Sequence, residues 1–264
     1  MIARPTVVAN RVKDHRGGHG GSILKSHRQF VAALLTSATW ICTVFSGSLA
    51  SQKNAMPNTL TATEKAEGWR LLFDGETTSG WRGFRQGKMP DGWKAVAGEL
   101  TRVGRAGDIV TADEFGDFDL KIDWKLTPNA NSGIFFRVTE DDEVMWHTAP
   151  ELQIIDNAYK EPLKPTQLAG ANYDLHAPAR DATRPVGSWN TTRLLVRGSH
   201  VEHWLNDVKV VEYELWSPDW ERLVQASKFK DFPRYARAKR GHIGLQDHGD
   251  RVAFRNIKIL ELKS

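Results

Sequence analysis

The chain has 264 residues, of which 36 are Lys or Arg and 32 are Asp or Glu, and its formal net charge is +4. Residues 1–50 carry +5 of this charge, so the remainder of the chain is close to −1. A nearly neutral remainder offers no cationic surface for phosphates, which excludes nucleic acid as an expected partner. The single cysteine, Cys42, also lies in residues 1–50, so we expect no disulfide and no thiolate metal site in residues 51–264.

An apolar stretch without charges runs from Phe30 to Phe45 and follows the basic residues. This order is typical of a secretory leader, and the stretch is shorter than the roughly 20 residues of a membrane-spanning helix. Ser48 and Ala50 supply small residues where signal peptidase recognises its substrates. We therefore predict a signal peptide over residues 1–50 and an exported protein, periplasmic or extracellular, with no membrane attachment after cleavage. An uncleaved N-terminal anchor is the alternative.

The remaining sequence divides into two parts. Residues 51–66 are polar and without periodicity, which favours a flexible tether, and residues 67–264 are expected to form one domain. Its clearest strand is Phe118–Leu126, in which apolar and charged residues alternate. Turn residues at 128–133 separate it from a second strand at 134–138, and we expect these two strands to form a hairpin.

Further strands follow toward the C-terminus. The segments 192–196, 201–205 and 208–213 predict a three-stranded meander, and 242–246 with 252–260 predict a hairpin with a bulge near Arg255-Asn256. Pro218–Phe229 has helical spacing, which predicts one short helix or lid. Because no βαβ alternation is present, the expected fold is all-β: a two-sheet antiparallel jelly-roll sandwich with one short helix.

The segment 146–157 carries the densest set of reactive side chains. Glu151 and Gln153 lie two residues apart in a predicted strand and therefore share one face, while Leu152 and Ile154 face the core. His147 lies a few residues upstream, where it could join them. A solvated strand face is the alternative interpretation.

Two other segments are candidates. His176 lies in a long irregular stretch, 159–187, and loops of this length in ordered domains are usually functional, although a plain surface histidine fits as well. Asp247 and Asp250 lie at a predicted turn and could contribute to a weak Ca²⁺ site. Residues 51–264 also contain nine tryptophans, several of them beside hydrogen-bonding groups; sugar sites combine such groups, but most of these indoles are equally expected in the core.

Five segments resemble, in order, the 3-keto-disaccharide hydrolase domain family of the concanavalin A-like lectin/glucanase superfamily. This resemblance implies a concanavalin A-like jelly roll and an exported carbohydrate-active enzyme. The segments are 71–75 with Gly80-Trp81, 131–137, 151–157, 187–190 and 241–249.

The resemblance also implies a substrate and a mechanism. The substrate is a 3-keto-glycoside or 3-keto-disaccharide whose C3 hydroxyl a separate oxidoreductase has oxidised. The ketone acidifies the C2 proton, so a base can remove it and the C1 oxygen departs by β-elimination, after which water adds. This route needs a base, a donor for the C3 carbonyl and an acid. The implied catalytic candidates are His147, Glu151 and His176, and the implied substrate-binding candidates are Arg137, Trp146, Gln153, Asn190, Gln246 and His248.

Three alternatives remain open at this stage. No cofactor is required by the sequence, but a divalent metal, Ca²⁺ or a transition metal, could polarise the carbonyl instead. A non-catalytic lectin-like module would need only the aromatic and polar residues. A conventional glycosidase would need two carboxylates across the bond, for which Glu151 and Asp156 are the nearest pair, although Asp156 has the position of a turn residue.

The leader generates the first testable prediction. Because the small residues at 48 and 50 precede the cleavage point, the mature protein is expected to begin at Ser51. Intact-mass and N-terminal peptide analysis of the protein recovered from outside the cytoplasm measures this directly. Recovery of the chain with residues 1–50 still attached would contradict the prediction.

Overall fold

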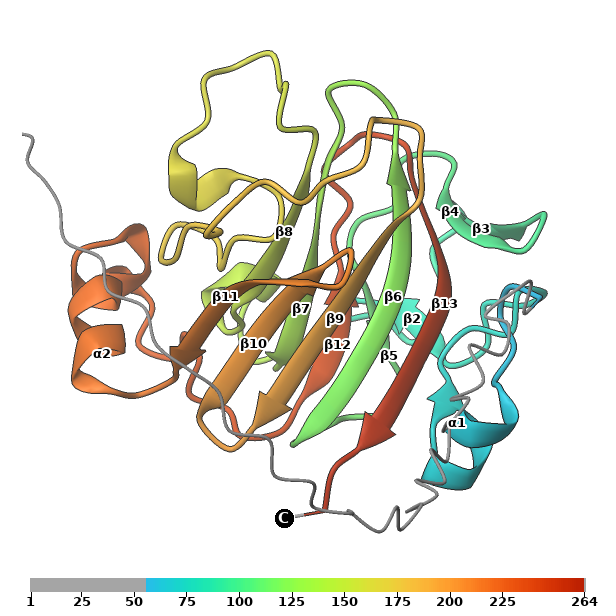
Figure 1. Cartoon of the computed structure of the whole chain (residues 1–264), viewed down its shortest axis with the longest axis horizontal. Helices are drawn as coiled ribbons and strands as arrows, with labels where there is room; N and C mark the ends of the chain where they lie inside the picture. The colour runs from blue at the N-terminus through green and yellow to red at the C-terminus, as the bar shows by residue number, and fades with distance from the viewer. Residues whose placement is uncertain (1–55, 264) are drawn as a thin grey trace, which may run out of the picture. The chain divides into compact units, whose positions relative to one another are not determined.

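Two antiparallel sheets packed face to face make up the fold in the computed structural model, which describes residues 56–263 (Figure 1). The predicted signal peptide and its cleavage site lie outside these residues. The larger sheet has eight strands, in the order β11-β10-β9-β6-β13-β4-β3 with β1 paired to β13. Its strands are β1 (Arg70–Leu71), β3 (Trp93–Val96), β4 (Glu99–Arg102), β6 (Phe118–Leu126), β9 (Asn190–Arg197), β10 (His200–Leu205), β11 (Val208–Glu214) and β13 (Val252–Glu261).

The smaller sheet has five strands in the order β2-β5-β12-β7-β8. They are β2 (Trp81–Gly83), β5 (Ile109–Thr111), β7 (Asn131–Val138), β8 (Glu151–Ile155) and β12 (His242–Leu245). Two α-helices and three 3₁₀ turns accompany the sheets: α1 (Ala62–Glu67), α2 (Pro218–Gln225), η1 (Met145–His147), η2 (Pro165–Gln167) and η3 (Lys228–Asp231). The chain is thus a two-sheet antiparallel jelly-roll sandwich, as expected.

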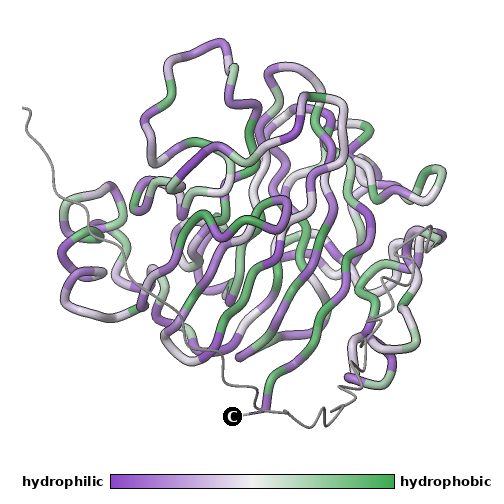
Figure 2. Tube along the Cα trace, viewed as in Figure 1, coloured by the Kyte–Doolittle hydropathy of each residue, from purple (hydrophilic) through white to green (hydrophobic). Residues whose placement is uncertain are grey.

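The core lies between the sheets and follows the predicted alternation. Phe118, Leu120 and Ile122 on β6 are fully buried, and Leu152 and Ile154 on β8 reach the same core from the opposite sheet. Apolar and polar residues alternate along the strands in Figure 2. None of the helices in the described range is long and apolar enough to cross a membrane.

Both predicted hairpins are wrong, although their strands exist. β6 pairs with β9 and β13 in the larger sheet, whereas β7 pairs with β8 and β12 in the smaller sheet. Likewise β12 and β13 belong to different sheets. The turns between these strands carry the chain across the sandwich. Turn residues and alternation look the same whether the next strand pairs with the last one or crosses to the other sheet.

The meander of β9, β10 and β11 is confirmed, and so is the bulge in β13. The register between β13 and β6 shifts between Arg255 and Lys258, and Asn256 takes a positive φ of 52° there. Asn256 donates to Asp123 through Nδ2 at 2.7 Å, which stabilises the irregular backbone.

Two helical segments differ from expectation in detail. Residues 62–66, predicted as part of the tether, form α1 together with Glu67, because Thr61 and Glu64 make a reciprocal capping box that satisfies the first amides of the helix. The predicted helix over 218–229 ends at Gln225, and Ser227 then caps the separate turn η3. This second turn presents Lys228 to the site described below.

Candidate functional site

The strand β8 carries two polar side chains on the face of the smaller sheet that points away from the larger sheet. Leu152 and Ile154 pack into the core, so Glu151 and Gln153 lie on the opposite face. The free edge of β8 is covered by residues 170–173, where Tyr173 N–H donates to Glu151 O at 3.0 Å. The predicted pairing of Glu151 and Gln153 on one face is therefore confirmed, but both residues are buried, being 7% and 1% exposed.

Glycine on the neighbouring strand makes room for the carboxyl of Glu151. A Cβ atom at Gly133 on β7 would lie 2.1 Å from Glu151 Oε1, far closer than van der Waals contact allows. The carboxyl thus lies across the backbone of β7 in space that any other residue at 133 would fill. This contact is the reason that the side chain can be buried on an outward face.

A pocket of about 260 Å³ opens above Glu151, and we call it the Glu151 pocket. Its members come from β7, β8, the chain after β12, the 170–173 segment, η1 and η3. Its polar members are Asn131, Glu151, Gln153, Gln246, His248 and Lys228, and its aromatic members are Trp146 and Tyr173.

A second pocket of about 210 Å³ adjoins the first, and we call it the Tyr159 pocket. Tyr159 and Glu161, from the loop after β8, line it. Because four residues line both pockets, the two form one continuous groove. The shared residues are Asn131, Gln153, Tyr173 and His248.

The electrostatics of Glu151 are unusual. Burial raises its pKa from 4.5 to about 8, with the charge of Asp108 acting in the same direction and that of Lys228 in the opposite one. Within the described residues no side chain or backbone amide donates to its carboxylate. Burial also raises the pKa of Asp108 from 3.8 to about 6, although its carboxylate accepts from Asp247 N–H at 2.9 Å. Groups whose pKa lies near neutrality are suited to proton transfer.

Three buried amide oxygens around this carboxyl also lack partners. They are Asn131 Oδ1, Gln153 Oε1 and Gln246 Oε1, each without a hydrogen bond among the described residues. An unpaired buried acceptor destabilises the folded state by about 1–3 kcal/mol, so a cluster of three destabilises the free protein considerably. Hydroxyl groups of a ligand would satisfy all of them.

Five of the nine sequence candidates meet in this one pocket. They are Trp146, Glu151, Gln153, Gln246 and His248. Trp146 is fixed by Phe232, whose ring centroid lies 4.8 Å away in an edge-on arrangement. The structure thus brings together segments that are more than a hundred residues apart in the chain.

The other four candidates lie elsewhere. His147 pairs with Asp142 at 2.6 Å and stacks on Phe232, beside the pocket but not in its lining. His176 stacks on Tyr213, and burial lowers its pKa.

Arg137 and Asn190 are held by internal contacts. Arg137 is buried, donates to Gly116 O and pairs with Asp117. Asn190 accepts from the backbone of Arg184 at 2.7 Å and lines a different pocket. Catalytic or binding roles for these four residues remain predictions of the sequence.

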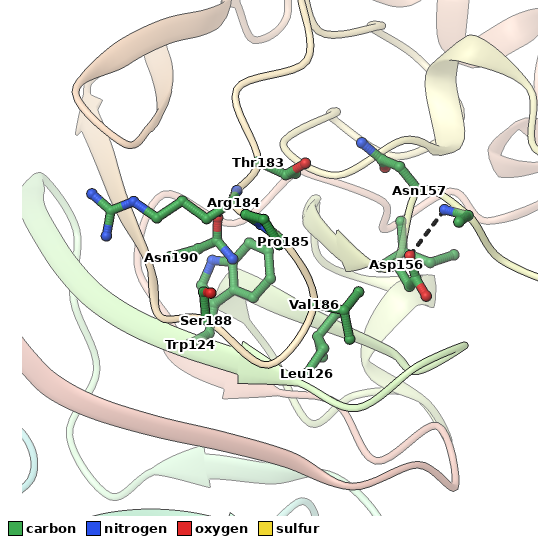
Figure 3. Close-up of a pocket in the computed structure, with 12 residues that line it drawn as sticks. Trp124, Leu126, Asp156, Asn157, Thr183, Arg184, Pro185, Val186, Ser188 and Asn190 are labelled. Carbon is green, nitrogen blue, oxygen red and sulfur yellow. Dashed lines mark hydrogen bonds between the residues drawn. The ribbon is translucent and has the colours of Figure 1, made fainter.

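That different pocket, of about 370 Å³, lies where β6 ends and β9 begins, beside the loop after β8. Figure 3 shows Trp124 and Asn190 on one side of it and Asp156 on the other. The carboxylate of Asp156 accepts from Asn129 N–H and Ala158 N–H, both at 2.9 Å, so Asp156 is the turn residue that the sequence suggested. It does not face Glu151 across a common pocket.

The carboxylates of the acidic residues near the C-terminal turn likewise have partners within the protein. Asp247 pairs with Arg102 at 2.7 Å and accepts from three backbone amides, and Asp250 accepts from Asn131 N–H. Within residues 56–263, one group of His and carboxylate side chains is close enough to share a metal ion, and it lies on β10 and β11, outside the Glu151 pocket. It comprises His200, Glu202 and Glu212.

Four residues of the site were missed by the sequence interpretation. Asn131 and Tyr173 lie in segments noted for other reasons, the first in a family-like motif and the second in the long loop. Asp108 and Lys228 carry no local signal, because each is one charged residue among many. Only the packing of distant elements gives them their environment.

A jelly-roll sandwich with a groove of amides, aromatic rings and an isolated carboxyl is typical of carbohydrate-active proteins. A family model described as the 3-keto-alpha-glucoside-1,2-lyase-like domain matches residues 68–260. The chain therefore belongs to this family.

Similar proteins agree with this assignment. The chain is 34% identical over 181 residues to a 3-keto-disaccharide hydrolase of Bacteroides thetaiotaomicron, a match that covers 59% of this chain and 62% of that protein. It thus spans less than two thirds of the length of that relative. A crystal structure of a candidate glycosyl hydrolase from Parabacteroides distasonis is 35% identical, with a TM-score of 0.74 over 79% of this chain and all of the other. A second from the same organism is 28% identical, with a TM-score of 0.59 over 74% of this chain and 99% of the other.

The raised pKa of Glu151 predicts a pH effect on stability. Between about pH 5 and about pH 8 the folded protein keeps a proton that the unfolded chain releases, so rising pH favours unfolding. Relative to Glu151→Gln, the wild-type free energy of unfolding should fall by about 1.4 kcal/mol per pH unit in this window. Urea unfolding of both proteins at several pH values measures the difference. Asp108 is present in both proteins, so its own titration contributes to both pH profiles. Parallel pH profiles would contradict the prediction.

The close contact between Gly133 and Glu151 leads to a second prediction for the pH dependence of unfolding. In Gly133→Ala the new methyl group would occupy the position of Glu151 Oε1 and move the carboxyl toward solvent. The pKa of Glu151 should then return toward 4.5, and the pH dependence of unfolding should weaken. Gly87→Ala is the matched control, because no atom lies within 4 Å of its added Cβ. If Gly133→Ala keeps the full wild-type slope, the close contact does not control the burial of Glu151.

Proposed function

We propose that this protein cleaves the glycosidic bond of 3-keto-glycosides or 3-keto-disaccharides by removal of the C2 proton and β-elimination, followed by hydration. The family assignment and the name of the Bacteroides relative support the class of substrate. The observation that carries the mechanism is the buried, unpaired carboxyl of Glu151 within the groove.

Glu151 in its ionised form is the proposed base; this form is the minor one below about pH 8, and the charge of Lys228 favours it. A carboxyl whose pKa lies near 8 binds the abstracted proton far more strongly than an exposed glutamate does. In the first step the C2–H bond breaks, the C1=C2 double bond forms and the C1–O bond to the leaving sugar breaks. Water then adds its hydroxyl to C1 and its proton to C2. The sum is hydrolysis, without any external oxidant or reductant.

His248 is the proposed acid for the leaving oxygen. It lines both pockets, so it lies at their junction, where the bond between two sugar units would lie if each occupied one pocket. Histidine can hold a transferable proton at neutral pH. The unpaired amide oxygens of Asn131, Gln153 and Gln246 would accept hydrogen bonds from sugar hydroxyls on either side of it.

The substrate would come from a separate oxidoreductase that converts the C3 hydroxyl to a ketone. We also propose that the reaction takes place outside the cytoplasm, which is where the predicted leader would deliver the protein. No conventional pair of carboxylates is needed, and Glu151 is the only carboxylic acid among the described residues that line its pocket.

Turnover of 3-keto-trehalose or a 3-keto-glucoside tests the proposal. The wild-type protein should release the free sugars, and in D₂O the keto product should carry deuterium at C2. Glu151→Gln should lower kcat about 10²–10⁴-fold because it removes the base. Glu212→Gln changes an exposed carboxylate of β11 outside the Glu151 pocket; it is the matched control and should leave the rate unchanged.

The possible failures point to different alternatives. Binding of ordinary glycans without turnover of any 3-keto substrate would indicate a lectin-like module instead. Cleavage of unoxidised glycosides would indicate a conventional glycosidase. Full activity of Glu151→Gln would show that the site is wrongly placed.

A further inference from the structure

Lys228 is the cation of the Glu151 pocket. It is the first residue of η3 and follows Ser227, whose hydroxyl caps the turn. Its Nζ lies over three aromatic rings, 4.4 Å from the centroid of Trp146, 4.7 Å from that of Tyr173 and 5.3 Å from that of Phe229. Much of the residue is exposed along its length, yet the ammonium end reaches the rings that line the pocket.

The ammonium group has no acceptor of its own. Within residues 56–263 no oxygen accepts a hydrogen bond from Nζ, and no carboxylate pairs with it. The aromatic faces stabilise the positive charge and fix its position, but they leave its N–H groups free. Burial lowers the pKa of Lys228, while the charges of Glu151 and Asp174 act in the opposite direction.

The position of Trp146 depends on the same turn. Phe229, the next residue of η3, lies 6.5 Å from Trp146 between ring centroids and 3.9 Å from Tyr235, on which it stacks. The aromatic packing therefore fixes η3 against η1, and with it the end of Lys228. An ammonium held in this way is preorganised toward the pocket rather than free on the surface.

The proposed reaction creates a need for such a group. Removal of the C2 proton moves negative charge onto the oxygen at C3, and the barrier falls if a fixed donor faces that oxygen. The unpaired oxygens of Asn131, Gln153 and Gln246 are acceptors and suit hydroxyl groups, whereas an ammonium is a donor only. Among the described residues that line the pocket, Lys228 is the lysine whose ammonium N–H groups can donate to an enolate oxygen.

We propose that the Lys228 ammonium donates to the C3 carbonyl oxygen of the substrate and stabilises the enolate that forms when the C2 proton leaves. This inference rests on the proposed function. It makes Lys228 a catalytic residue and the group that favours a 3-keto sugar over the 3-hydroxy parent, because a hydroxyl oxygen develops no negative charge. The ammonium keeps its proton throughout, so the proton balance of the elimination is unchanged.

Lys228→Met tests the inference, because it keeps the length of the side chain and removes the charge. With a 3-keto-glucoside, kcat should fall about 10²–10³-fold. Lys228→Arg keeps a cationic donor and should retain more activity than Lys228→Met. Lys230→Met is the matched control: it removes an exposed lysine of the same turn that does not line the pocket, and it should behave as wild type.

A second readout separates carbonyl polarisation from a structural role. A 3-keto sugar with hydrogen in place of the leaving group at C1 cannot lose an aglycone, but its C2 proton can still exchange with D₂O. Wild type and Lys230→Met should catalyse this exchange, and Lys228→Met should slow it about 10²-fold or more. Thermal unfolding of each variant confirms that the proteins compared are folded.

The outcomes are distinguishable. If wild type turns over no 3-keto substrate, the proposed function fails. If wild type is active and a folded Lys228→Met exchanges the C2 proton at the wild-type rate, the function stands and the role of Lys228 is wrong. Loss of wild-type activity on dialysis against EDTA, restored by Ca²⁺ or a transition metal, would assign the carbonyl to a metal ion and also overturn the role of Lys228.

Discussion

The carboxyl of Glu151 is buried against the backbone of β7, in space left by Gly133, and the rest of the site depends on that contact. A carboxyl removed from water without hydrogen-bond donors holds its proton to a higher pH, and Glu151 accordingly has a pKa of about 8. The strands around it contribute amide oxygens that also lack partners. Together these groups form a polar pocket whose hydrogen-bonding capacity is largely unused in the free protein.

Aromatic side chains provide the second constraint. Trp146 from η1 lines the pocket and packs against the buried Phe229 from η3, and Tyr173 closes the edge of β8. These rings hold the Lys228 ammonium without neutralising it. The pocket therefore combines a carboxyl that prefers to be neutral with a cation that lacks a partner. Both are suited to a reaction in which a proton leaves carbon and charge develops on a neighbouring oxygen.

The sandwich supplies the rigidity that this arrangement needs. β7 and β8 are strands of a sheet whose other face is packed into a continuous core, so Glu151 and Gln153 cannot move without disturbing Leu152 and Ile154. The loops after β8 and β12 then add Tyr159 and His248 to the groove. Residues on strands fix the Glu151 carboxyl, while residues on turns supply His248, Lys228 and the second pocket.

The sequence by itself determined the strands from β6 to β13 and the placement of Glu151 and Gln153 on one side of β8, because alternation in a strand is a local property. It also assigned the bulge at Asn256 and the turn role of Asp156.

The sequence could not decide that β6 and β7 lie in different sheets, because the same turn residues occur in a hairpin and in a connection that crosses to the other sheet. It could not show that Lys228 and Asp108 act on Glu151, or that His147 and His176 lie outside the pocket. These placements depend on contacts between segments that are distant in the sequence. Only the tertiary structure brought Gly133, Glu151, Gln246 and Lys228 together, and burial in that setting gives Glu151 its chemistry.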